Sequence, residues 1–201
     1  YGIYSESSNN LFLNNTINIT TNGLNSRGMY INDGNESRVF DNKIFTIGKR
    51  AYGIRFEGFN NRVNVSGNYI EGEVAPNGVF VTVLEPSQHF ANSSIVNNHI
   101  VCKSAKEEQA ALYISDTWRT VFANNLIEGE LCSGIQVIRS TGNLIMNNTL
   151  VLKANSGIGI INYADYGPNL FINNVIVNYT KLIVHPLKDY SDYVNTKVIN
   201  G

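Results

Sequence analysis

The chain has 201 residues, of which 15% are charged, and its formal net charge is −1. Because the charges nearly balance, composition gives no support for a nucleic acid or an anionic membrane surface as partner. No stretch approaches the roughly 20 consecutive apolar residues that a membrane-spanning helix needs. The length fits one domain with a continuous core.

Seven asparagines at similar intervals along the chain are each followed two residues later by isoleucine or leucine. The intervals between successive copies run from 23 to 30 residues, so the register survives insertions. A repeat of this length is typical of solenoids, in which equivalent residues of successive coils stack in columns. The repeated asparagines are Asn15, Asn42, Asn68, Asn98, Asn125, Asn148 and Asn174.

Each unit is predicted to open with a short strand that starts at a small residue. After that residue, apolar side chains alternate, as in residues 53–57 and 134–137, which predicts a strand with one buried face. A second strand ends shortly before the repeated asparagine and a third begins after it. No linker is long enough for a helical crossover. The small residues are Gly2, Gly28, Gly53, Gly78, Ala111, Gly134 and Gly157.

The repeated asparagine itself is predicted to adopt the left-handed conformation of a sharp turn, which Asn tolerates. Stacked copies would hydrogen-bond to one another as an asparagine ladder. The predicted fold is therefore all-β, a right-handed parallel β-helix of about seven to eight coils. We expect the repeats over residues 1–184 and an irregular tail over residues 185–201 that caps the core.

Insertions interrupt the repeat at residues 83–90, 103–109 and 163–168. Solenoids carry insertions on their faces, where binding often occurs. Two of these insertions follow a first strand, so they are expected beside the same edge. Because the chain opens directly in a repeat strand, we expect it either to belong to a longer protein or to stack on another subunit.

The units resemble the right-handed parallel β-helix repeat proteins of the pectin-lyase-like superfamily. The resemblance is carried by residues 133–137 followed by residues 142–150, and it covers residues 2–184. It implies a β-helix from a group that includes polysaccharide lyases, glycoside hydrolases, uronate epimerases, phage tailspikes and noncatalytic surface proteins. The signatures of pectin-degrading hydrolases and alginate epimerases are absent, so the resemblance does not select an activity.

In each first strand, the second residue after the small residue is predicted to point outward. That column reads Tyr4, Tyr30, Arg55, Phe80, Tyr113, Gln136 and Gly159. The next outward column reads Glu6, Asn32, Glu57, Thr82, Ser115, Ile138 and Ile161. Asp33, Asp116 and Arg139 follow at the turn, and Glu85 lies on the longest insertion. Exposed rings beside acidic groups suit a linear glycan, which offers CH surfaces and hydroxyls.

We therefore expect an extracellular or cell-surface protein, a location with which several Asn-X-Ser/Thr sequons agree. The residues expected to bind polysaccharide are Tyr30, Phe80, Tyr113, Asp116 and Arg139. Two catalytic chemistries also fit this face. In a lyase, Arg55, or a lysine such as Lys49, would act on the proton α to a uronate carboxylate while Glu57 and Glu85 hold Ca²⁺. In a hydrolase, Glu57 and Glu85 would be the two carboxylates.

A noncatalytic alternative uses the same face. The aromatic column would then join copies of the protein, or neighbouring repeats of a longer chain, in a surface layer, adhesin, filament or tailspike. In that interpretation, Arg55 and Glu57 form a surface ion pair with little energetic weight. The sequence leaves binding, catalysis and assembly open.

Apart from the Ca²⁺ that Glu57 and Glu85 would hold in a lyase, no metal site is predicted. The three histidines, His89, His99 and His185, show no zinc-ligand spacing. The paired glutamates of residues 71–73 and 128–130 are expected to keep a sheet edge soluble. Cys102 and Cys132 follow the third strands of neighbouring coils, so a disulfide and two free thiols both remain open.

Overall fold

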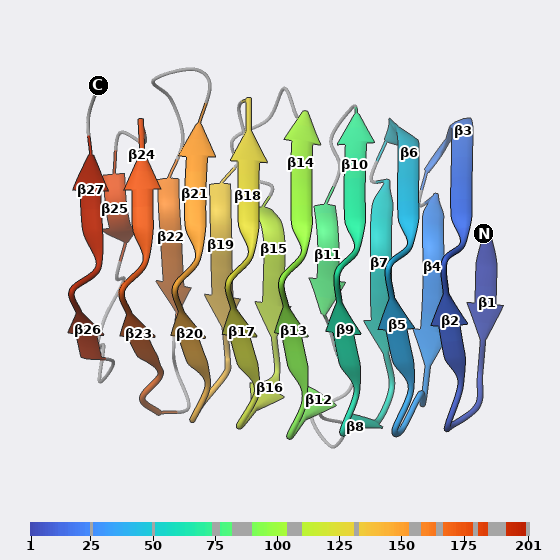
Figure 1. Ribbon diagram of the computed structural model, residues 1–201, viewed down its shortest axis with the longest axis horizontal. Coiled ribbons are helices and arrows are strands. Elements are labelled where there is room, and N and C mark those ends of the chain that lie inside the picture. The colour runs from blue at the N-terminus through green and yellow to red at the C-terminus, as the bar shows by residue number, and fades with distance from the viewer. Residues whose placement is uncertain are drawn as a thin grey trace.

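The computed structural model describes residues 1–24, 26–49, 51–73, 77–81, 90–103, 110–130, 133–152, 158–163, 167–178, 181–184 and 192–199. Every element in these residues is a β-strand, and all strand pairs are parallel. The strands wind into a solenoid whose coils lie side by side along the long axis, from β1 (Ile3–Ser5) to β27 (Lys197–Ile199) (Figure 1). The predicted all-β parallel solenoid is confirmed.

Three sheets of eight strands each run along the solenoid. The first sheet contains β1, β4 (Arg27–Asn32), β7 (Tyr52–Glu57), β11 (Asn77–Val81), β15 (Ala110–Ser115), β19 (Ser133–Ile138), β22 (Ile158–Tyr163) and β25 (Lys181–Val184). The second contains β2 (Leu11–Leu13), β5 (Arg38–Phe40), β9 (Asn64–Ser66), β13 (Ser94–Val96), β17 (Val121–Ala123), β20 (Leu144–Met146), β23 (Leu170–Ile172) and β26 (Asp192–Val194). The third contains β3 (Thr16–Leu24), β6 (Lys43–Lys49), β10 (Tyr69–Glu73), β14 (His99–Lys103), β18 (Leu126–Gly129), β21 (Thr149–Leu152), β24 (Val175–Val177) and β27. A short fourth sheet, formed by β8 (Asn60–Asn61), β12 (Phe90–Ala91) and β16 (Thr117–Trp118), lies between the first and second sheets along the chain.

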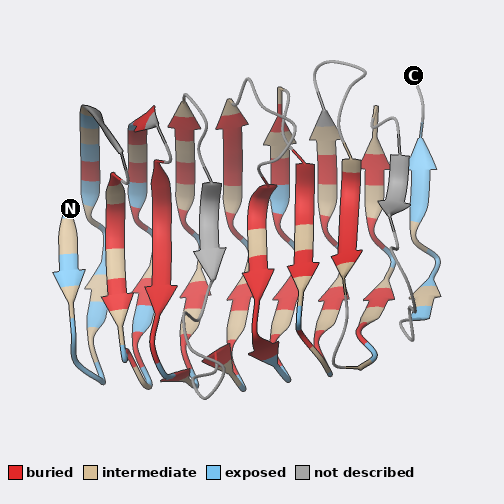
Figure 2. Cartoon of the chain, turned by 180° about the vertical axis from the view of Figure 1, so that it is seen from behind, coloured by how far each residue is buried: buried red, intermediate tan, exposed pale blue. Residues whose placement is uncertain are grey.

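One apolar core fills the solenoid. In the first sheet, Met29, Ile31, Ile54 and Phe56 point inward and have no exposed surface. The residues between them point to the other face, as alternation along a strand requires. Figure 2 shows this burial along the strands of the first sheet. The period-two pattern in the sequence therefore identified the core side of these strands.

Near the start of the first strands, Gly28 and Gly134 are required because a side chain has no room there. A Cβ atom on Gly28 would lie 2.3 Å from Cγ2 of Ile44 and 2.6 Å from the carbonyl oxygen of Gly53. A Cβ atom on Gly134 would meet Leu150 at 2.4 Å and the carbonyl oxygen of Gly159 at 2.7 Å. The close approach of successive coils thus excludes larger residues.

This column corrects one prediction about register. Gly159, rather than Gly157, continues the small-residue column, because Ile161 pairs with Gln136 in β19. The prediction that Gly159 and Ile161 occupy the first and second outward columns was wrong by two residues. Because Gly157 and Gly159 are two residues apart, the alternation in the sequence fits either one as the member of the small-residue column. The contact with Gly134 in the neighbouring coil shows that it is Gly159.

The repeated asparagines form the predicted ladder between the second and third sheets. At each step, the backbone N–H and the side-chain Nδ2 of one asparagine donate to Oδ1 of the next, at 2.8–3.1 Å. The same Nδ2 also donates to a carbonyl of the preceding coil, as from Asn98 to Val65 at 3.1 Å. Thr196 stands at the next position, where its Oγ1 is 3.5 Å from Asn174 Nδ2.

The left-handed residue of this turn is not the ladder asparagine but the residue before it, so that part of the prediction was wrong. These preceding residues have φ angles between +52° and +69°. Reversing the backbone there turns the following side chain toward the ladder, where its amide is buried. The left-handed residues are Asn14, Asp41, Gly67, Asn97, Asn124, Asn147 and Asn173.

A second polar column precedes the second sheet and was not predicted. Asn143 donates from its backbone N–H and from Nδ2 to Asn169 Oδ1, at 3.1 and 2.9 Å. Thr120 donates its backbone N–H to Asn143 Oδ1 at 3.0 Å, and Val63 donates to Ser93 Oγ at 3.0 Å. The signal was present, because a Ser, Thr or Asn recurs two residues before the buried residue of most second strands.

The solenoid continues past Val184, the predicted boundary of the repeats. Strands β26 and β27 pair with β23 and β24 in the same register as their predecessors. Tyr193 stacks on Phe171 with ring centroids 4.6 Å apart and packs against the apolar core. Residues 185–191 lie outside the described residues.

Replacing a central ladder residue should reduce stability. Asn98→Ala deprives Asn68 of its shared acceptor and removes the donor to Val65, so we expect a loss of about 3 kcal/mol in the free energy of unfolding. Denaturant titration measures it. Asn18→Ala, at an exposed position of β3 in the third sheet, is the control and should change it by less than about 0.5 kcal/mol. Equal effects of the two substitutions would contradict a stabilising role for the ladder.

Candidate functional site

The outer face of the first sheet holds most of the residues predicted to be functional. Its register places Tyr4 beside Tyr30, Tyr30 beside Arg55, Arg55 beside Phe80 and Phe80 beside Tyr113. The predicted column is therefore correct from Tyr4 to Gln136, which pairs with Tyr113. Asn32 and Glu57 also pair, as predicted for the second outward column.

Arg55 and Glu57 form a buried ion pair. Arg55 Nη2 donates to Glu57 Oε1, and the two residues are 9% and 5% exposed. The hydroxyl of Tyr30 donates to Glu57 Oε2, so that both carboxylate oxygens accept a hydrogen bond. The Arg55 guanidinium also lies 4.9 Å from the ring centroid of Tyr52. The charge of Glu57 is thus satisfied within the protein.

Burial shifts the titration of this cluster. Desolvation lowers the pKa of Arg55, and the nearby Arg27 guanidinium lowers it further. Desolvation likewise raises the pKa of Tyr30, although Arg27 and Arg55 oppose the shift. A guanidinium loses its proton only in strongly basic solution, so Arg55 still carries its charge near neutral pH. The cluster is therefore a charged, nearly covered scaffold.

Three tyrosines and an arginine form a second cluster beside the ion pair. Tyr4 and Tyr1 both stack on Tyr30, with ring centroids 5.3 and 5.4 Å apart. Arg27 Cζ lies 4.3 Å from the Tyr30 centroid, and its Nη1 donates to the Tyr1 hydroxyl at 2.6 Å. The rings of Tyr1 and Tyr4 and the guanidinium of Arg27 thus all contact the ring of Tyr30, which is half-buried.

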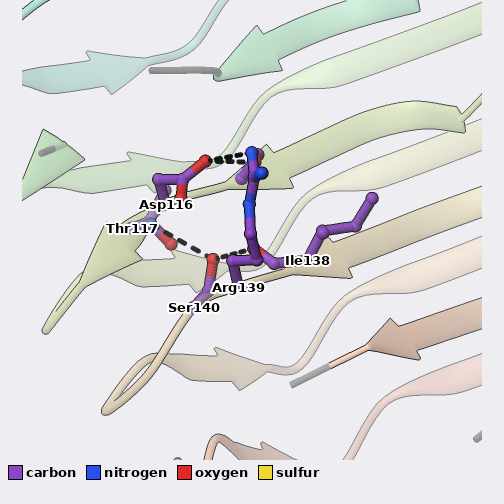
Figure 3. Close-up of polar contacts among 6 residues, drawn as sticks. Asp116, Thr117, Ile138, Arg139 and Ser140 are labelled. Atoms are coloured by element: carbon purple, nitrogen blue, oxygen red, sulfur yellow. Dashed lines mark hydrogen bonds and ion pairs between the residues drawn. The ribbon is translucent and has the colours of Figure 1, made fainter. Parts of the chain in front are cut away.

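Asp116 and Arg139 come from neighbouring turns and meet, as Figure 3 shows. Arg139 Nη2 donates to Asp116 Oδ2 at 2.8 Å, and the Ser115 hydroxyl donates to the same oxygen at 2.5 Å. The backbone N–H of Thr117 donates to Ser140 Oγ at 3.1 Å, which joins the two turns. The Arg139 side chain keeps 48% of its surface exposed, whereas that of Asp116 keeps 11%.

Tyr113 lies between these two regions. It is half-buried, and desolvation raises the pKa of its phenol while the charge of Arg139 opposes the shift. Phe80 pairs through its backbone with Arg55 and Tyr113, but its side chain lies outside the described residues. Glu85 also lies outside them, so its separation from Glu57 stays a prediction.

The third sheet carries a charged network that sequence reasoning found only in part. Lys103 Nζ donates to Glu71 and, at 3.2 Å, to Glu73, so that one lysine bridges the two glutamates. Tyr69 donates to Glu71 at 2.6 Å. We assigned Lys103 to an insertion, but it ends β14 and pairs with Glu73. The spacing of 30 residues, equal to that from Asn68 to Asn98, would have revealed the pair.

A groove at the turns after the first sheet was not predicted. It encloses about 430 Å³ and is lined by Ala91, Asn92, Trp118, Arg119, Thr141 and Gly142. Trp118 is 40% exposed. The only signal in the sequence is a single tryptophan in a turn, which does not by itself indicate a groove.

Two further predictions concern metals and cysteines. Across the ranges that the structure describes, no three His, Cys, Asp or Glu side chains gather where they would hold a metal ion. Cys102 is buried in the core, and Cys132 lies outside the described residues. The pairing of the two cysteines therefore stays a prediction.

No family model, curated protein or solved structure matches the chain. The parallel solenoid is therefore established by the arrangement of its own strands. In the described part of the chain there is no helix of the length and apolar character that crossing a membrane requires.

The buried ion pair can be tested against an exposed one of the same chemistry. Glu57→Ala leaves the Arg55 guanidinium covered and without its carboxylate, so we expect a loss of about 3 kcal/mol in the free energy of unfolding. Glu36→Ala, which removes the partner of Arg62 in a pair whose side chains are 67% and 46% exposed, should cost less than about 1 kcal/mol. Denaturant titration measures both, and equal losses would contradict the assignment.

The phenol of Tyr69 should lose its proton at a higher pH than an ordinary tyrosine. Its hydrogen bond to Glu71, together with burial, raises the pKa of Tyr69 to about 12. The protonated phenol therefore stabilises the folded state fully below pH ~10, and this contribution is lost as the pH rises through about 12. Subtracting the tyrosinate absorbance curve of Tyr69→Phe from that of the parent protein isolates this residue. Glu71→Gln should lower its midpoint toward ~10, and an unchanged midpoint would contradict the cause.

Proposed function

We propose that this protein binds polysaccharide through the outer face of its first sheet, at the extracellular side of a cell. The observation that carries the proposal is the register that places Tyr30, Arg55, Phe80 and Tyr113 in one row across four successive coils. A rigid row of this kind repeats about every 4.8 Å, so a linear polymer can be contacted at several successive units.

The chemistry of the row supports a glycan as the polymer. Tyrosine rings offer apolar surface together with a hydroxyl. At the neighbouring turn, the exposed Arg139 guanidinium and the Asp116 carboxylate offer donors and an acceptor for sugar hydroxyls. We also propose that the chain belongs to the pectin-lyase-like superfamily, and the sequence resemblance supports this.

Binding without cleavage is the function that the geometry supports best. Glu57 accepts hydrogen bonds on both carboxylate oxygens, and its ion pair with Arg55 is nearly covered. A group that removes a proton or attacks a sugar must reach the substrate. Of the three residues predicted to be catalytic, Arg55 and Glu57 thus fit a scaffold that orients Tyr30 better than a reacting pair, and Glu85 lies outside the described residues.

Affinity measurements on a panel of neutral and acidic polysaccharides test the proposal. Tyr113→Ala should weaken binding at least tenfold, about 1.4 kcal/mol, because the substitution removes an aromatic contact at one end of the row. Tyr69→Ala, on the third sheet, is the matched control and should leave affinity unchanged. Absence of binding across the panel would overturn the proposal. New reducing ends or ultraviolet-absorbing unsaturated products would establish cleavage by a hydrolase or a lyase.

A second candidate function is assembly. The cluster of Tyr1, Tyr4, Tyr30 and Arg27 favours it, because Tyr1 and Tyr4 remain 66% and 49% exposed and aromatic residues with arginine are enriched at protein interfaces. Light scattering over a range of concentrations would detect a symmetric oligomer. Loss of that oligomer in Tyr4→Ala, with no affinity for any glycan, would favour assembly over binding.

A further inference from the structure

The groove beside Trp118 exists because one large side chain stands in a column of small ones. Trp118 pairs with Ala91 in the preceding coil and with Thr141 in the following coil. Adjacent strands lie about 4.8 Å apart, so the column neighbours leave room along the indole. The backbone N–H groups of Asn92 and Arg119 donate to the carbonyls of Trp118 and Thr141, at 3.0 and 3.3 Å. These hydrogen bonds fix the position of each turn of the groove relative to the turn of the next coil.

Gly142 keeps one side of the groove open. Its φ of +67° continues the left-handed turn position that Asn92 and Arg119 occupy in the preceding coils. A Cβ atom there would have Arg119 Cγ as its nearest neighbour, at 3.7 Å. The absence of a side chain at Gly142 thus leaves space beside the aliphatic part of Arg119.

Arg119 brings a positive charge to this groove. It is exposed and forms no ion pair with any residue in the described ranges. Arg62 occupies the same turn position two coils earlier, and there Glu36 neutralises it at 3.0 Å. The comparison separates an arginine held by an internal carboxylate from one whose charge is available to a ligand.

We propose that this groove binds a single pyranose ring that carries an anionic group, either a carboxylate or a sulfate ester. The Trp118 ring receives the apolar CH surface of the sugar. The Arg119 guanidinium receives the anion through charge-assisted hydrogen bonds. The Thr141 hydroxyl and the Asn92 amide oxygen contact the sugar hydroxyls. The volume of the groove lies within the range of small-molecule sites.

This site is distinct from the row of Tyr30 to Tyr113 and does not rest on the proposed function. None of its lining residues belongs to the first sheet. A protein that binds no polysaccharide on the first sheet could still bind an anionic sugar here, and the reverse also holds. The two proposals therefore fail separately.

The chain contains a single tryptophan, so its fluorescence reports on this groove alone. We would titrate the full chain with methyl glucuronide, glucose 6-sulfate, methyl glucoside and inorganic sulfate. A saturable change is expected for at least one anionic sugar, with an affinity at least tenfold above those of methyl glucoside and inorganic sulfate. The anionic sugar that binds more tightly identifies the source of the charge. No change with either anionic sugar would overturn the proposal, as would equal binding of methyl glucoside or of inorganic sulfate.

A pair of arginine variants isolates the role of charge. Arg119→Gln should weaken binding of the preferred anionic sugar at least tenfold and leave methyl glucoside unaffected. Arg62→Gln, at the matched turn position, should leave both affinities as in the parent protein. Equal losses from Arg119→Gln and Arg62→Gln would show a general electrostatic effect and overturn the site.

Discussion

The shared amide of the asparagine ladder is the interaction on which this solenoid depends. Asn98 illustrates it: its Oδ1 accepts two hydrogen bonds from Asn68, and its Nδ2 donates to Asn125 and to the carbonyl of Val65. One buried side chain therefore links three coils. Because a buried amide that loses its partners is costly, the ladder holds each coil at one register relative to the next.

Fixed register gives the outer surface its order. The second polar column, with Asn143 and Asn169, holds the turns that precede the second sheet, so both ends of each second strand are tied to neighbouring coils. Side chains in one column then become neighbours although some 23–30 residues separate them in the chain. Asp116 and Arg139 meet for this reason, and so do Glu73 and Lys103. Such a surface is organised before a ligand arrives, which lowers the entropy lost on binding.

Two regions of this surface differ in how their charges are used. On the first sheet, Arg55 and Glu57 neutralise one another, and they contact Tyr52 and Tyr30. At the groove, no carboxylate of a described residue pairs with Arg119, and the neighbouring side chains are small. The first arrangement favours contacts to uncharged sugar hydroxyls and CH surfaces, whereas the second favours an anion. In our two proposals, the first region would bind neutral sugar units and the second an anionic one.

Much of the fold and part of the site followed from the sequence. The interval between the repeated asparagines predicted the number of residues in one coil. The alternation after each small residue predicted which side chains of the first strand face outward. Counting from Gly28, Gly53 and Gly78 placed Tyr30, Arg55 and Phe80 in one row, as the sheet register confirms. Residue spacing along the chain and the direction of each Cβ atom determine these features. They can therefore be predicted without knowing which residues of other coils lie nearby.

What only the tertiary structure decided depends on the space that neighbouring coils leave. Gly157 and Gly159 fit the pattern equally, and the carbonyl of Gly159 beside Gly134 selects the second. The left-handed residue precedes the ladder asparagine because the buried amide must point at its copies. Trp118 lines a groove because Ala91 and Thr141, in other coils, are small. The position of a residue within one repeat determines the column to which it belongs. The space around its side chain, its burial and its hydrogen-bond partners depend on the residues of neighbouring coils, so they are decided only when the coils stack.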